Sequence, residues 1–262
     1  MSAIDRNRAA WNERAKRRER HTRTASAKDL ENPMRWLDPE KWVGPDLISQ
    51  NVLCLGAGGG MQSALCAAAG GQVTVVDISR EMLELDARVA AKYNFALRLI
   101  DTTMEDLSML GDASFDLVMQ PVSTCYVPDV RPVFREVARV LKAGGLYISQ
   151  HKQPVNLQAS ALSSNGLYSV VEPYYRSGAL PPEAVDAPHR EAGTTEFLHT
   201  WESLIGQMCR AGFVIEDLAE PRHDNAHAPD GSFEHRSRFI PPYVKIRARR
   251  LQAKSPPQLW TP

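Results

Sequence analysis

Short apolar runs alternate with segments of helical periodicity between residues 51 and 150. Runs rich in β-branched and apolar residues, typical of strands, occupy 52–55, 73–76, 96–100, 115–119 and 146–149. Between most of them, apolar residues recur at helical spacing. Strands that alternate with helices in this way form βαβ units, whose strands lie parallel within one sheet. The pattern therefore predicts an α/β protein with a doubly wound parallel sheet.

A glycine-rich loop follows the first predicted strand and reads Gly56-Ala57-Gly58-Gly59-Gly60-Met61. In doubly wound sheets, ligands bind beyond the carboxyl ends of the strands, where this loop should lie. Glycines permit a sharp turn and let a ligand approach the backbone without meeting a Cβ atom. The spacing is GxGxG rather than the GxGxxG of the dinucleotide-binding fingerprint. The loop alone is compatible with a ligand site or with a structural turn.

Asp77 ends the second predicted strand, 21 positions after Gly56. A carboxylate at this place can accept hydrogen bonds from ribose hydroxyls and would repel a 2′-phosphate. The alternative is an aspartate that only caps the following helix. Taken together, the glycine loop and Asp77 predict a cofactor that carries adenosine.

Four segments of the chain resemble the successive motifs of class I S-adenosylmethionine-dependent methyltransferases. They are VLCLGAGGG (52–60), VTVVDIS (73–79), FDLVMQPVSTCYV (115–127) and REVARVLKAGGLYIS (135–149). The chain is similar to the small-molecule enzymes of the type 11 subgroup, typified by ubiquinone and menaquinone biosynthesis. Residues 200–222 and 240–250 resemble, more loosely, the last helix and the antiparallel strand pair of that fold. The resemblance implies a Rossmann-like seven-stranded sheet, mostly parallel with an antiparallel last strand.

The resemblance also implies a cofactor, S-adenosylmethionine, with S-adenosylhomocysteine as its product. The glycine loop would receive the methionine moiety, Asp77 would hold the ribose, and the Met104 N–H would face the adenine edge. Gln120 would lie close to the sulfonium. The cofactor-binding residues implied in this way are Gly56, Ala57, Gly58, Gly60, Asp77, Ile78, Met82, Thr103, Met104, Glu105 and Gln120.

Candidates for the acceptor side lie outside these motifs. His151 directly follows the fifth predicted strand, and we expect it to emerge near the cofactor as a general base, because histidine titrates near neutral pH. The alternative is a histidine with an ordinary structural hydrogen bond. His199 and Trp201 precede the late helix and are predicted to line the acceptor pocket. Trp11 and Arg14 are predicted to cap the pocket, unless their helix only packs on the core.

The length of 262 residues suits one large domain. Its predicted parts are an N-terminal helical cap (1–50), the cofactor-binding core (51–151), an insert over the acceptor pocket (152–198), the last helix with the antiparallel strand pair (199–250), and a tail (251–262).

Acidic and basic side chains balance, with 31 of each. A chain without net charge has no general field that would attract nucleic acid or a membrane surface. No apolar run reaches the roughly 18 residues of a membrane span, and no apolar segment typical of a secretory signal is visible. We therefore expect a cytoplasmic protein that binds neither membrane nor nucleic acid.

No metal site is predicted. The four cysteines form no CxxC pair, and their spacing fits neither a zinc site nor a disulfide framework. His223, His227 and His235 lie with Asp224 in a segment of loop composition, so no predicted helix brings their side chains together.

The predicted function is methyl transfer from S-adenosylmethionine, by in-line displacement, to an oxygen, nitrogen or carbon atom of a small molecule. The protein must align the reacting atoms and remove a proton when the nucleophile is neutral. Two alternatives stay open. Basic residues near both ends suggest an RNA or protein methyltransferase. Cys54 and Thr103, where the family commonly has acidic residues, suggest a non-catalytic cofactor-binding or regulatory module.

Overall fold

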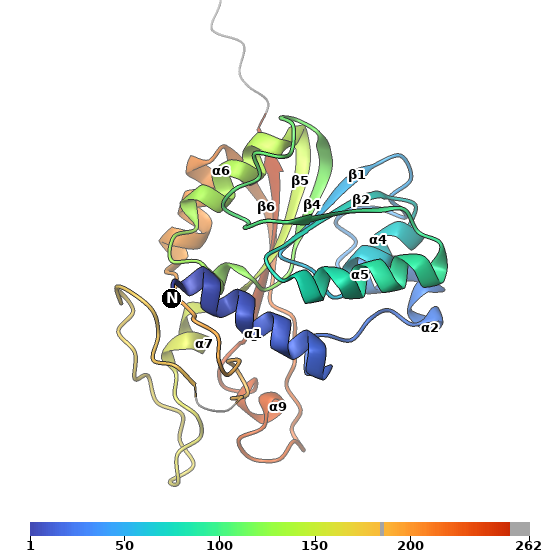
Figure 1. Cartoon of the computed structure of the whole chain (residues 1–262). Coiled ribbons are helices and arrows are strands. Elements are labelled where there is room, and N and C mark those ends of the chain that lie inside the picture. The colour runs from blue at the N-terminus through green and yellow to red at the C-terminus, as the bar shows by residue number, and fades with distance from the viewer. Residues whose placement is uncertain (184–185, 252–262) are drawn as a thin grey trace, which may run out of the picture.

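The computed structural model describes residues 1–183 and 186–251. A seven-stranded sheet forms its centre, in the order β3-β2-β1-β4-β5-β7-β6 (Figure 1). The strands are β1 (Asn51–Leu55), β2 (Gln72–Asp77), β3 (Leu97–Asp101), β4 (Phe115–Gln120), β5 (Leu141–Lys152), β6 (Phe213–Ala219) and β7 (Tyr243–Arg250). β1 to β5 pair in parallel, whereas β7 runs antiparallel to both of its neighbours. The predicted α/β fold, mostly parallel with an antiparallel last strand, is confirmed.

Helices cover both faces of this sheet. They are α1 (Ala3–Arg17), α2 (Ala27–Leu30), α3 (Pro33–Leu37), α4 (Gln62–Ala68), α5 (Arg80–Tyr93), α6 (Arg131–Val140), α7 (Pro154–Gln158), α8 (Gln207–Arg210) and α9 (Phe233–Arg236), with a 3₁₀ turn η1 (Thr124–Tyr126) and a π-helical segment η2 (Glu202–Gly206). Ser79 caps α5 as its residue type favours, accepting the Met82 N–H at 3.2 Å.

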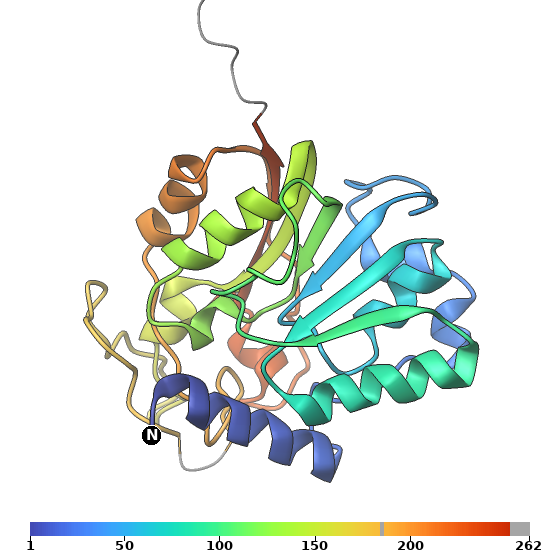
Figure 2. The same ribbon diagram turned by 45° about the horizontal axis from the view of Figure 1, so that its top comes forward.

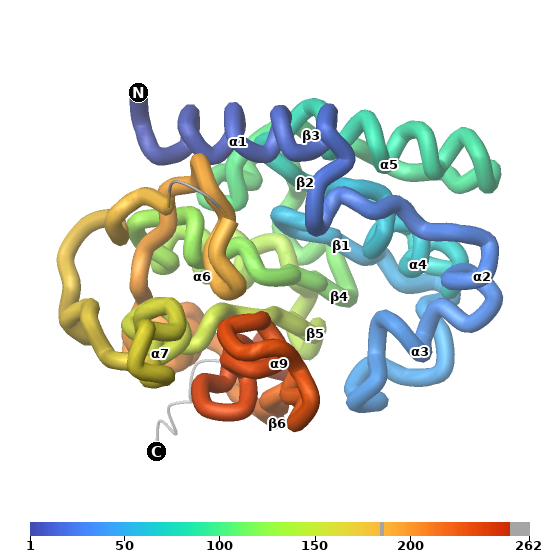
Figure 3. The backbone as a smooth tube through the Cα atoms, turned by 90° about the horizontal axis from the view of Figure 1, so that it is seen from below, coloured from blue at the N-terminus to red at the C-terminus, as the bar shows by residue number. Residues whose placement is uncertain are grey.

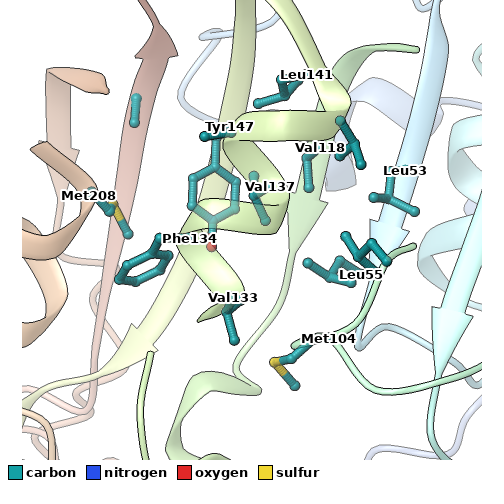
Figure 4. Close-up of a cluster of buried hydrophobic side chains, with 14 of the residues drawn as sticks. Leu53, Leu55, Met104, Val118, Val133, Phe134, Val137, Leu141, Tyr147 and Met208 are labelled. Atoms are coloured by element: carbon teal, nitrogen blue, oxygen red, sulfur yellow. The ribbon is translucent and has the colours of Figure 1, made fainter. Parts of the chain in front are cut away.

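Side-chain alternation along the strands builds two apolar layers, because successive residues of a strand face opposite sides of the sheet. Leu53 and Leu55 of β1 join the cluster under α6 and α8, where Phe134 and Met208 pack (Figure 4). Val52 and Cys54 join the opposite cluster, together with α4. Cys54 is therefore a buried apolar residue in a packed layer.

The predicted strands differ from the structure by at most one residue at either end, except for the fifth. The third strand covers Leu97–Asp101 rather than 96–100, and the fifth is much longer than 146–149. Pairing with β7 extends the fifth strand at its carboxyl end, since His151 and Lys152 lie opposite Val244 and Tyr243. These two residues are consequently part of a strand and do not belong to the loop after it.

The carboxyl edge of the parallel strands is the part of the fold that α1 and the later loops surround (Figure 3). α1 packs beside α5 and crosses near this edge (Figure 2). Among the described residues, no helix is both long and apolar enough to cross a membrane. The predicted tail 251–262 falls outside the described residues except for Leu251.

Candidate functional site

A cavity of about 620 Å³ lies at the carboxyl edge, next to the neighbouring strands β1 and β4. The order of strands reverses here, which is where open α/β sheets form their binding crevice. The volume falls within the range of small-molecule pockets, ~300–1,000 Å³. The cavity is lined by Trp11, His21, Arg23, Trp36, Leu37, Gly56, Ala57, Gly58, Met61, Gln62, Leu65, Asp77, Ile78, Met82, Met104, Pro121, Val122, Ser123, Tyr126, Gln150, Lys152, Glu191 and Tyr243.

Asp77 braces the glycine loop from the end of β2. One carboxylate oxygen accepts the Gly58 N–H at 2.9 Å, and the other accepts the Ser79 N–H at 2.8 Å. A Cβ atom on Gly58 would lie 2.9 Å from Asp77 Oδ2 and 2.9 Å from the Met82 Cβ atom. Only glycine therefore allows this approach. Each Asp77 oxygen keeps further lone pairs for a ligand, because a carboxylate has about four acceptor sites.

Asp86 of α5 supports the same loop from below. Its carboxylate accepts the N–H groups of Gly59 and Gly60 at 2.8 and 3.0 Å, and the Ser63 hydroxyl as well. Gly60 has a φ of 73°, and the Leu85 carbonyl would lie 2.9 Å from any Cβ atom there. The sequence analysis did not identify Asp86, although an acidic residue on the inner face of a predicted helix was the available signal.

Burial shifts both carboxylic acids. It raises the pKa of Asp77 to about 6, against hydrogen bonds from the backbone of Ser79 and Gly58 that lower it. It raises the pKa of Asp86 to about 7, with the nearby charge of Asp77 adding to the effect. A donor that reaches Asp77 from the cavity would therefore stabilise its ionised form.

The glycine loop uses most of its N–H groups internally. Gly56 donates to the Val76 carbonyl at 2.8 Å, and Gly58, Gly59 and Gly60 donate to the two carboxylates. Within residues 1–183 and 186–251, no acceptor receives the N–H of Ala57, which lines the cavity. Among the described residues the Met61 N–H has no acceptor either, and Met61 also lines the cavity, so the loop leaves two backbone donors unused.

Seven of the eleven predicted cofactor residues meet at this cavity: Gly56, Ala57, Gly58, Asp77, Ile78, Met82 and Met104. Gly60, Thr103, Glu105 and Gln120 do not line it. Gln120 is almost completely buried, and its amide donates to Ser123 Oγ at 2.9 Å. Its expected position at the sulfonium is therefore not supported. Gln120 instead holds Ser123, a residue that does line the cavity.

His151 does not reach the cavity. Its ring is fully buried, Nδ1 lies 2.8 Å from Thr124 Oγ1, and Nε2 lies 2.8 Å from Ser149 Oγ. Burial, with a contribution from His199, lowers the pKa of His151 to about 3. The expectation that it emerges near the cofactor is wrong, because β5 continues past it and directs the ring into the core. The structural alternative describes this histidine.

Of the four residues predicted to cap or line the acceptor pocket, one lines the cavity and three do not. Trp11 lines the cavity, whereas Arg14 pairs with Asp186 and donates to the Ala192 carbonyl at 3.3 Å. His199 is buried with Nε2 3.0 Å from the Thr124 carbonyl, and Trp201 packs against the core under α6. Of these residues, only Trp11 meets the cavity.

The cavity is also lined by residues that the sequence analysis missed: His21, Tyr126, Gln150, Lys152, Glu191 and Tyr243. Lys152 Nζ donates to Glu191 Oε2 at 2.9 Å and to Glu196 Oε2 at 3.0 Å. Burial alone would lower the pKa of Lys152, but the two carboxylates outweigh it and raise that pKa above its usual value. Lys152 directly follows His151, so strand alternation was the one signal that could have identified it.

No group of three or more histidine, cysteine or carboxylate side chains is placed to hold a metal ion in the described part of the chain. His235, from the predicted loop, lies with Nδ1 2.9 Å from the Tyr168 hydroxyl.

Known proteins resemble this chain in sequence and in fold. The model of a family described as a methyltransferase domain matches residues 53–149. The uncharacterized methyltransferase YbaJ of Bacillus subtilis (strain 168) is 35% identical over 187 residues, which cover 70% of this chain and 73% of that protein. A ubiquinone biosynthesis O-methyltransferase of Xanthomonas oryzae is 33% identical over 105 residues, covering 40% of this chain and 44% of that enzyme.

Two solved structures share the fold. An S-adenosylmethionine dependent methyltransferase from Mesorhizobium loti has a TM-score of 0.66 at 22% identity, covering 84% of this chain and 100% of that one. Geranyl diphosphate C-methyltransferase from Streptomyces coelicolor A3(2) has a TM-score of 0.65 at 16% identity, covering 96% and 99%.

Proposed function

For this chain, which belongs to the class I S-adenosylmethionine-dependent methyltransferases, we propose that the methyl acceptor is a small molecule bound in the cavity at the carboxyl edge. The observation that carries the proposal is that α1 and the insert both line this cavity, through Trp11 and Glu191, and are joined to each other. Asn7 of α1 is buried, and it bonds both the N–H and the carbonyl of Thr195, at 2.6 and 3.0 Å. Helix and insert are thus held together beside a cavity whose volume suits a metabolite.

The residues at the glycine loop fit the cofactor of this family. A ribose diol can donate hydrogen bonds to Asp77, and the Ala57 N–H can meet a carboxylate. Ile78 and Met82 supply apolar surface for the adenine, and Met104 adds to it. When bound, S-adenosylmethionine supplies a methyl group activated by a positively charged sulfur. The remaining work, which this chain must do, is to orient the acceptor, exclude water and take up a proton.

Charge pairing favours a small acceptor over RNA. Three of the four basic residues of β7 are paired with carboxylates: Lys245 with Glu40, and Arg247 and Arg249 with Glu216. The fourth, Arg250, donates to the Ala138 carbonyl. Phosphate binding requires cations that are free to replace the counterions of the nucleic acid. The non-catalytic alternative also weakens, since Cys54 lies in the core away from the cavity.

Calorimetry and methyl transfer together test the proposal. We expect Asp77→Asn to bind S-adenosylhomocysteine at least 10-fold more weakly, because a charged acceptor is worth about 1.5–3 kcal/mol per hydrogen bond. The matched control is Asp46→Asn, at an exposed position outside the cavity, and it should bind normally. Radiolabelled S-adenosylmethionine is then offered with a metabolite extract, with RNA and with protein. Label that enters only RNA or protein would contradict the proposal.

A further inference from the structure

Four titratable side chains from distant parts of the chain meet at one wall of the cavity. They are His21 after α1, Tyr126 of η1, Lys152 of β5 and Glu191 of the insert, and all four line the cavity. The Tyr126 hydroxyl donates to Glu191 Oε2 at 3.0 Å, and His21 Nε2 lies 3.7 Å from Glu191 Oε1.

The two oxygens of Glu191 have different environments. Oε2 accepts hydrogen bonds from both Lys152 and Tyr126. Across the described residues, the closest charged partner of Oε1 is His21, at a distance beyond a hydrogen bond. Catalytic hydrogen bonds are often long before substrate binds. Oε1 is thus the oxygen that remains available to an acceptor in the cavity.

His21 provides a route from Glu191 to solvent. Its side chain is 42% exposed, while that of Glu191 is 10% exposed. The residue has a φ of 69°, a left-handed conformation that is uncommon for a residue with a Cβ atom and is often found at functional sites. Its backbone carbonyl passes close to Gly59 of the glycine loop. His21 therefore lies between the glycine loop, which its backbone approaches, and Glu191, which its ring approaches.

We propose that Glu191 and His21 act as the proton-accepting pair for a neutral acceptor that carries a hydroxyl or an amine. This rests on the proposed function. The lone pair of the acceptor forms the bond to the methyl carbon, and the methyl–sulfur bond breaks with its electrons on sulfur. The proton leaves the acceptor for Glu191 Oε1 and passes to His21 Nε2 and to solvent. One proton is released for each methyl group transferred.

The surrounding charges suit these roles. The pKa of Glu191 is lowered despite its burial, because Lys152, then His21, and a hydrogen bond from Tyr126 favour the carboxylate. Burial lowers the pKa of His21, and Glu191 opposes this. At neutral pH, the pair is therefore an ionised carboxylate next to an uncharged imidazole. The other charged groups that face His21 are Arg14, Arg20 and Lys152, and those around Glu191 include Arg190 and Glu196.

Glu191→Gln and His21→Gln test the pair, with Glu202→Gln and His227→Gln as exposed matched controls. Each variant is first titrated with S-adenosylhomocysteine, and we expect all four to bind within threefold of the parent. The His21 ring is then titrated by NMR. Its pKa should fall in Glu191→Gln and stay unchanged in Glu202→Gln.

Turnover is measured with a neutral phenol or amine taken from a substrate panel. Both site variants should lower kcat by 10²–10⁴-fold, the usual contribution of a general base. They should regain rate with a phenol of low pKa at pH 9, since an acceptor that is already ionised needs no base. The controls should keep the parent rate.

The inference would be overturned if kcat were unchanged in both site variants, or if the His21 pKa were the same in Glu191→Gln as in the parent. Either result would leave the proposed function intact. If the parent protein failed to bind S-adenosylhomocysteine, that result would instead contradict the proposed function. The change in the His21 pKa caused by Glu191→Gln would still be measured by NMR in that case, so the two failures are distinguishable.

Discussion

Replacing Gly58 by alanine should separate ligand binding from folding. The new Cβ atom would lie 2.9 Å from Asp77 Oδ2 and from the Met82 Cβ atom, where ordinary contacts begin near 3.4 Å. Neither neighbour moves freely, because Asp77 is also held by the Ser79 N–H and Met82 lies within α5. The backbone of Gly58 is not in the left-handed region, so the penalty is one of contact and not of φ.

The contact sets the size of both effects. Overpacking of this kind costs about 1–3 kcal/mol, so the free energy of unfolding should fall by that amount. Displacement of the Asp77 carboxylate should cost the ligand one charge-assisted hydrogen bond, about 1.5–3 kcal/mol. That loss corresponds to a roughly 10- to 150-fold weaker affinity for S-adenosylhomocysteine.

Urea denaturation measures the first effect, and calorimetry with S-adenosylhomocysteine measures the second. Gly111→Ala is the matched control, because its Cβ atom would also meet a side chain, Ser114 Oγ at 2.9 Å, in an exposed loop outside the cavity. It should leave the affinity unchanged. A folded Gly58→Ala protein that binds within threefold of the parent would refute the argument that the ligand lies against this loop.

Three further outcomes follow from buried titratable side chains. Affinity for S-adenosylhomocysteine should rise between about pH 5 and 7, because the pKa of Asp77 is about 6 and ligand hydroxyls favour its ionised form. Binding should release protons in this range, and calorimetry in two buffers of different ionisation enthalpy measures the number released. Lys152→Met should lower the free energy of unfolding by about 3–5 kcal/mol in urea, since it removes the buried cation that Glu191 and Glu196 share. His151→Phe should also reduce stability at pH 7, because Thr124 and Ser149 lose a partner. The pKa of His151 is about 3 in the folded protein and near 6.5 in the unfolded chain, so the parent loses stability as the pH falls from about 6.5 to 3. The variant lacks this titrating group and should lose less stability over the same pH range.

The sequence predicts for a local reason that the glycine loop and Asp77 lie together. A buried strand, its glycine loop and the acidic residue at the end of the next strand are fixed by short segments and by parallel pairing. Gly58 and Asp77 therefore meet wherever β1 and β2 pair in register, as they do here through Leu55 and Val76. Asp86 escapes the same reasoning, because only the packing of α5 under the loop reveals its partners.

The cavity wall around Glu191 could not be predicted in this way. His21, Tyr126, Lys152 and Glu191 come from four separate segments, and no periodicity connects them. The choice of His151 over Lys152 depended on where β5 ends, and that boundary is set by pairing with β7, a strand about ninety residues later. A one-residue difference along a strand reverses the face on which a side chain lies.

Several buried charges meet at the cavity, while others, such as Asp38 and Arg236, are buried elsewhere in the described residues. Asp77, Lys152 and Glu191 line the cavity, and Asp86 and Glu196 support those lining residues or the glycine loop. A buried ion pair is weak evidence for stability, because apolar residues of similar volume often stabilise a core as well or better. The layers under α4 and α6 are largely apolar in that manner. A group of opposite charges such as Lys152, Glu191 and Glu196, buried together at a cavity wall, is better explained by chemistry at that wall, since perturbed titratable groups cluster at functional sites.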